Sequence, residues 1–84
     1  MKEIVSGDLG VQILGRAGLR YREGERSVSI DGEMGGGDVD FIVYVSSIAV
    51  WDRTSEPIYA EERSRILENI RRVLDGNGLV VKFE

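Results

Sequence analysis

Alternating apolar and polar residues predict a β-hairpin in the first half of the chain. The two alternating runs cover residues 19–23 and 26–33. Between them, Gly24-Glu25 fits a tight two-residue turn with glycine in the first position. A hairpin closed by that turn pairs Tyr21 with Val28 and Leu19 with Ile30, which places the apolar side chains of both strands on one face. Turn chemistry and apolar pattern therefore agree on one register.

The stretch Asp38–Asp52 is expected to supply the central strand of the sheet. It is rich in β-branched and aromatic residues, and both of its sides are apolar, which is typical of a strand covered on two faces. The glycine-rich run 34–37 ahead of it is expected to be a four-residue hairpin loop. In that register Ile30 opposes Phe41, and the apolar face continues across three strands. Ser46-Ser47 interrupt the strand, which favours a bulge or a change of the buried face.

The second half of the chain predicts one helix and a closing strand. From about residue 60 to residue 74, apolar residues recur at the spacing of one helical face, namely Ile66, Leu67, Ile70, Val73 and Leu74. Residues 76–78 end the helix, and residues 79–83 read as a strand. The order strand, helix, strand favours a right-handed crossover, with the last strand beside the central one and parallel to it. An antiparallel position at the far edge is the alternative.

Together these elements predict an α+β fold in a single small domain over residues 1–84. We expect a mainly antiparallel sheet of about 4–5 strands, one C-terminal helix packed on one face, and a final strand. Residues 1–18, broken by glycines, form either two short strands or one irregular strand. The hydrophobic fraction of 42% and the charged fraction of 31% are typical of a globular domain.

Composition and charge narrow the classes of function. The chain has no histidine, the commonest general base, and no cysteine for disulfides or thiolate chemistry. The net charge of −4 disfavours binding to nucleic acid and suits a basic partner. No apolar run approaches the roughly 20 residues of a membrane helix. We therefore expect a cytoplasmic protein that is not an enzyme, holds no cofactor, and binds neither nucleic acid nor membrane.

Four acidic residues flank the expected second hairpin: Asp31, Glu33, Asp38 and Asp40. In the expected register they share the face opposite the core, where like charges destabilise a sheet. They could form a solvated hairpin tip, receive basic side chains of a partner, or hold a hard cation such as calcium. The spacing matches no calcium-loop motif, and we expect no metal. The glycine run is better explained as a flexible loop than as a phosphate nest.

Other candidate partner-binding residues lie near this cluster. Arg20 and Arg22 occupy the outer face of the first hairpin, and Tyr44 occupies the same face of the central strand. Trp51 is either a core-edge or an interface residue, since tryptophan is enriched in binding hot spots. The candidate partner-binding residues are Asp31, Glu33, Asp38, Asp40, Tyr44, Trp51, Arg20 and Arg22.

The order of these segments resembles one known family. The segments are Ile30-Asp31-Gly32-Glu33, Val43-Tyr44-Val45-Ser46-Ser47-Ile48, Trp51-Asp52, Glu61-Glu62-Arg63 with Ile66, Asn69-Ile70, and a closing strand after Gly78. From about Tyr21 onward, their order and spacing are similar to the predicted bacterial immunity family called immunity protein 74. Such proteins are encoded beside polymorphic toxins and are thought to protect the producing cell by binding the toxin.

The resemblance implies a cognate protein toxin as the partner, and neither catalysis nor a cofactor. It agrees with the interpretation from residue chemistry. Two alternatives remain open: a small non-enzymatic domain of another role, structural or self-associating, and a hydrolase that uses paired carboxylates. The expected oligomeric state is a monomer or a weak homodimer.

Overall fold

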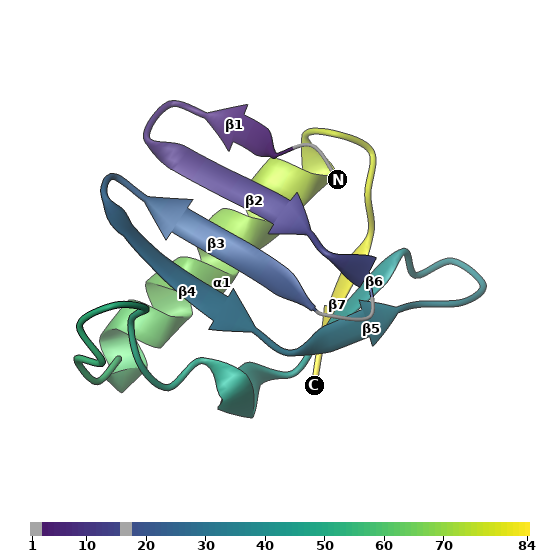
Figure 1. Cartoon of the computed structure of the whole chain (residues 1–84). Coiled ribbons are helices and arrows are strands. Elements are labelled where there is room, and N and C mark those ends of the chain that lie inside the picture. The colour runs from purple at the N-terminus through teal and green to yellow at the C-terminus, as the bar shows by residue number, and fades with distance from the viewer. Residues whose placement is uncertain (1–2, 16–17) are drawn as a thin grey trace.

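Two β-sheets and one long helix make up the fold in the computed structural model, which describes residues 3–15 and 18–84. The first sheet is antiparallel, with the strands in chain order: β1 (Ile4–Ser6), β2 (Leu9–Ile13), β3 (Leu19–Glu23) and β4 (Arg26–Ile30). The second sheet contains β5 (Gly32–Met34), β6 (Phe41–Val43) and β7 (Val81–Phe83). The helix α1 (Ala60–Asp75) crosses one face of the first sheet (Figure 1). The predicted α+β fold class is confirmed.

The β3–β4 hairpin has the predicted register. Tyr21 is paired with Val28 and Leu19 with Ile30. Gly24 has a φ of +60°, a conformation that glycine adopts without the penalty of a Cβ atom. Ahead of this hairpin, the chain forms the two short strands β1 and β2. Of the two expectations for residues 1–18, the one with two strands is therefore confirmed for the described residues 3–15 and 18. Residues 1–2 and 16–17 of that expectation lie outside the described residues.

The predicted register of the second hairpin is wrong. Glu33 is paired with Ile42, not with Asp38, and Gly32 is paired with Val43. The loop is longer than four residues, and the amide of Gly35 donates to the carbonyl of Asp40 at 3.0 Å. A Cβ atom on Gly32 would meet the Phe41 ring at 2.6 Å, so glycine is required where these two strands approach. The apolar face therefore does not run through one sheet, because β4 turns into β5 and a second sheet begins (Figure 1).

The predicted long strand over Asp38–Asp52 is also wrong. Only Phe41–Val43 is a strand, and Val45–Ser47 forms a 3₁₀ turn. The Ser47 hydroxyl explains the turn, because it donates to the carbonyl of Tyr44 at 2.7 Å and accepts from the amide of Asp31 at 2.8 Å. Of the apolar residues that follow, Ile48 and Trp51 enter the core from a loop, whereas Val50 is exposed. Local hydrogen bonding by serine thus outweighs β propensity.

Helix α1 and the last strand follow the sequence-based expectation. The helix buries Ile66, Ile70, Val73 and Leu74, while Leu67 is partly buried against the same core. Strand β7 lies beside β6 and runs parallel to it, so the crossover prediction is confirmed.

One continuous core lies between the helix, the two sheets and the segment that precedes the helix. Its buried apolar residues come from all of these elements. They are Val11, Ile13, Leu19, Tyr21, Val28, Ile30, Phe41, Val43, Ile48, Trp51, Ile58, Ile66, Ile70, Val73 and Leu74.

The open edge of β4 is closed by Asp52, through both its side chain and its backbone amide. Asp52 accepts from the backbone amide of Ser29 at 3.3 Å and from the hydroxyls of Ser27 and Ser29 at 3.2 and 3.1 Å. Its own backbone amide donates to the carbonyl of Ser27 at 2.8 Å. An unprotected edge strand invites pairing with other chains, and Asp52 removes that possibility along β4.

Candidate functional site

Glu33 and Tyr44 lie together on the outer face of the second sheet. The Tyr44 hydroxyl donates to a Glu33 carboxylate oxygen at 2.6 Å. This hydrogen bond raises the pKa of Tyr44 above its ordinary value of 10.0. Glu33, Ile42 and Lys82 are in register across the three strands, so Ile42 and Tyr44 form a small apolar centre between charged neighbours. We call Glu33, Ile42, Tyr44 and Lys82 the sheet patch.

The other three acidic residues do not share a face with Glu33 in the expected manner. Asp40 is tied to the strand entry of β7, since its carboxylate accepts from the amide of Val80 at 2.7 Å. Asp31 sits between β4 and β5, where its amide is bound by Ser47. Asp38 is exposed in the loop before β6. The predicted cluster is therefore a set of acidic side chains spread around one end of the molecule.

A metal centre finds no support in this arrangement. Among residues 3–15 and 18–84, no three Asp, Glu, His or Cys side chains are grouped so that they could hold a metal ion. Among these described residues, the α-helix α1 is too short and too polar to span a membrane.

Arg20 and Arg22 belong to the first sheet, away from the sheet patch. Both lie on the face opposite the helix, paired in register with Ser29 and Ser27. The guanidinium of Arg22 is engaged within the fold, because its Nε lies 3.2 Å from a Glu3 carboxylate oxygen. Arg20 is exposed. Of this pair, Arg20 therefore has the more exposed side chain.

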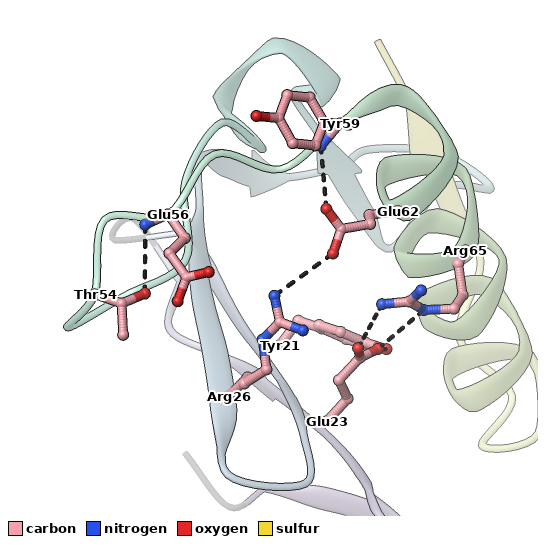
Figure 2. A network of polar contacts seen from close by, with 8 residues as sticks. All are labelled: Tyr21, Glu23, Arg26, Thr54, Glu56, Tyr59, Glu62 and Arg65. Atoms are coloured by element: carbon pink, nitrogen blue, oxygen red, sulfur yellow. Dashed lines mark hydrogen bonds and ion pairs between the residues drawn. The ribbon is translucent and has the colours of Figure 1, made fainter.

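The side chain of Trp51 is buried, with 1% of its surface exposed. The guanidinium of Arg26 covers its ring at 3.9 Å from the centroid, a favourable cation–π arrangement. Arg26 also reaches the Glu62 carboxylate on α1 at 3.5 Å (Figure 2). Trp51 is thus part of the core.

A polar network beside Arg26 joins the β3–β4 hairpin to the helix (Figure 2). The Tyr21 hydroxyl donates to Glu23 at 2.7 Å, and Arg65 donates to the other Glu23 oxygen at 2.6 Å. Burial alone would raise the pKa of Glu23, but the hydrogen bonds from Tyr21 and Arg65 outweigh it and lower the pKa. The network therefore helps to hold the helix on the first sheet.

Sequence reasoning missed a second exposed surface. Val50 is 46% exposed and Tyr59 is 68% exposed, and the two flank the loop that precedes the helix. The available signal was the occurrence of apolar residues at both ends of a polar stretch, next to Pro57. Val50 was instead assigned to the expected central strand, and Tyr59 to the start of the helix.

The comparisons with known proteins point to one family. The family model described as Immunity protein 74 matches residues 11–84, beginning earlier than the resemblance from Tyr21 onward suggested. No curated protein and no solved structure gives a match. Because the family model covers well over half of the chain, including the helix and the whole second sheet, the chain belongs to the immunity protein 74 family.

Proposed function

We propose that this protein neutralises a bacterial toxin by binding it directly. The observation that carries the proposal is the match to the immunity family over residues 11–84. Immunity of this kind needs no catalysis, since occlusion of the toxin is sufficient. The chain lacks histidine and cysteine, which is in keeping with a role in binding rather than chemistry. The expected cytoplasmic location remains a prediction.

Charge supplies the first part of the proposed mechanism. The net charge of −4 favours a toxin with a basic surface, such as one that acts on nucleic acid. Asp31, Glu33, Asp38 and Asp40 surround one end of the molecule and would attract that surface. Electrostatic attraction of this kind mainly accelerates association, and salt weakens it.

The sheet patch supplies the second part, a short-range contact. Tyr44 is held in place by Glu33, so its ring pays little conformational entropy on binding. Ile42 lies beside it and is partly exposed. An aromatic centre within a charged rim is the usual composition of an interface, and loss of such a centre mainly speeds dissociation. Arg20 and Trp51 lie outside this patch, and in this proposal they support or border the bound surface.

The test uses the toxin expected from a gene directly upstream, purified and measured for binding at two salt concentrations. One variant carries Asp31→Asn, Glu33→Gln, Asp38→Asn and Asp40→Asn, which preserve size and hydrogen-bond acceptors. We expect slower association and a flatter salt dependence than for the wild type. Tyr44→Ala should mainly raise the dissociation rate.

A control variant removes exposed acids elsewhere, through Asp8→Asn, Glu68→Gln and Asp75→Asn. For each charge removed, its association rate should fall by less than that of the four-acid variant. Protection of cells that express the toxin gives the functional readout. If the wild-type protein neither binds the upstream toxin nor protects cells, the proposed function is wrong.

A further inference from the structure

The chain between the 3₁₀ turn and α1 forms a small hairpin, residues 49–58, visible in Figure 1 as the green loop beside the first turn of the helix. We call it the 49–58 hairpin. Its stem is a ladder in which the amide of Ile58 donates to Ala49 at 2.8 Å and the amide of Trp51 donates to Glu56 at 2.9 Å. Val50 and Pro57 form a bridge between the two arms.

The turn of this hairpin is held in an uncommon conformation. Arg53 and Ser55 have φ values of 73° and 59°, and they are the residues other than glycine with positive φ in the described part of the chain. Backbone hydrogen bonds enforce this shape: the amide of Ser55 donates to Trp51 and the amide of Thr54 donates to Asp52. Such conformations persist only where the surroundings determine them, and they concentrate at functional sites.

The hairpin is also attached to the body at several points. Asp52 binds the edge of β4, and Trp51 is buried under Arg26. On the helix, the Nε atom of Arg63 donates to the carbonyl of Ile48 at 3.2 Å, just before the stem. The backbone amide of Tyr59, just after the stem, donates to the Glu62 carboxylate at 3.3 Å (Figure 2). A surface held in this way is preorganised for binding, which reduces the entropy lost on association.

The fixed hairpin exposes apolar side chains, and it also borders a hollow. Val50, Pro57 and Tyr59 are exposed, and we call them the apolar ledge. The adjacent hollow measures about 430 Å³ and is lined by Glu25, Arg26, Trp51, Asp52, Arg53, Thr54 and Glu56. The indole Nε1 of Trp51 is buried without a hydrogen-bond partner in the described residues.

We infer that the 49–58 hairpin is a second contact surface for the toxin, in which the apolar ledge is buried and the hollow receives a lysine or arginine side chain of the toxin. This inference rests on the proposed function and adds a surface to it. Exposed tyrosine and buried tryptophan beside a concave site are typical of interface hot spots. A volume of about 430 Å³ is near the low end for ligand sites and leaves room for one long side chain.

The charges of the hollow select a cation. Asp52 is occupied by the serines of β4, and Arg26 is paired with Glu62. Glu25 and Glu56 make no side-chain hydrogen bond or ion pair within residues 3–15 and 18–84. Against these two available carboxylates stands one available cation, Arg53. A basic side chain of the toxin therefore fits better than an acidic one.

The experiment measures binding of the upstream toxin to hairpin variants and to matched controls. Val50→Ser with Tyr59→Ala removes the apolar ledge, and both side chains are exposed, so folding should survive. The control, Val5→Ser, alters a residue on β1 that is 59% exposed. We expect the ledge variant to dissociate at least about tenfold faster and the control to match the wild type.

A second pair of variants tests the hollow. Glu56→Lys should weaken binding about tenfold, whereas Glu68→Lys, on the exposed side of α1, should have little effect. If the wild type binds the toxin while both hairpin variants bind like their controls, this inference is wrong and the proposed function stands. If the wild type does not bind, the proposed function fails with it. Circular dichroism of each variant confirms that the fold is intact.

Discussion

The side-chain amide of Asn69 on α1 donates a hydrogen bond of 2.9 Å to the hydroxyl of Tyr21 on β3, 48 residues away in the sequence. Tyr21 in turn donates to Glu23, and Arg72 donates to the Asn69 oxygen at 2.7 Å. The Tyr21 side chain is otherwise enclosed by the core. Its hydroxyl is therefore satisfied from both sides, and the helix is held on the sheet by polar as well as apolar contacts.

Tyr21 should make stability depend on pH in the alkaline range. Burial and the hydrogen bond to Glu23 raise the pKa of Tyr21 from 10.0 to about 12. A group whose pKa is raised on folding stabilises the native state in full below its unfolded pKa, and this stabilisation is lost as the pH rises through its folded pKa. The free energy of unfolding, measured by denaturant titration, should therefore fall between pH 10 and about 12.

Tyr21→Phe isolates this contribution, because it removes the titrating hydroxyl and retains the ring. We expect the variant to lose about 0.5–1.5 kcal/mol at neutral pH and to show a smaller decline in alkali than the wild type. Equal declines in the two proteins would mean that other groups cause the alkaline loss.

Ile70 should be essential to the packing of α1 on the sheet. Its side chain is fully buried in the core. Ile70→Ala leaves a cavity there and should lower the free energy of unfolding by about 2–5 kcal/mol. The control Glu68→Ala, two residues away and exposed, should change it by less than about 0.5 kcal/mol. A denaturation midpoint that Ile70→Ala leaves unchanged would contradict this packing.

Gly32 and Gly36 should respond differently to alanine. A Cβ atom at Gly32 would collide with the Ile42 carbonyl and lie 2.6 Å from the Phe41 ring, whereas one at Gly36 would meet nothing within 4 Å. Gly32→Ala should therefore destabilise the fold by about 1–3 kcal/mol, as overpacking does. Gly36→Ala should be nearly neutral in the same thermal or denaturant unfolding experiment. Similar losses in both variants would argue against the observed pairing of β5 with β6.

These two strands also show how far the sequence could predict the structure. The β3–β4 register was predictable, because the two-residue turn and the alternating pattern are local signals that agree. The β5–β6 register was not, because several loop lengths place apolar residues opposite one another. It is decided by contacts between distant residues: Gly32 against the Phe41 ring, and Asp40 hydrogen-bonded to Val80.

Of the two candidate surfaces, the sequence likewise predicted one and missed the other. Tyr44 and Glu33 were both identified from the sequence, and the structure joins them by a hydrogen bond. The 49–58 hairpin was not identified from the sequence, because β propensity favoured a strand that continued through Trp51. Its shape depends on side-chain contacts with β4 and α1 that no local pattern contains.

Calcium or magnesium should not bind to the acidic residues near β5 and β6. Asp40 is occupied by the amide of Val80, and Glu33 by the hydroxyl of Tyr44. Hard cations need several oxygen ligands in one shell. Titration with either ion at millimolar concentration should produce no saturable shift in the amide resonances of Asp31, Glu33, Asp38 or Asp40. A saturable shift at these four positions would establish a metal site.

Asp52 should protect the edge of β4 and hold the 49–58 hairpin in place. Its carboxylate accepts from both serines of β4, and its amide binds the same strand. Asp52→Ala should lower the free energy of unfolding by about 1–3 kcal/mol, because hydrogen bonds to a charged acceptor are lost. Hydrogen exchange at the Ser29 amide should also become faster, since that amide loses its acceptor. Asp38→Ala, an exposed loop change, serves as the control.

Because an uncovered edge promotes pairing between chains, the Asp52 variant should also self-associate more at high concentration, which sedimentation would detect. Unchanged exchange at Ser29 in the Asp52 variant would show that the backbone of the hairpin, and not this carboxylate, closes the edge.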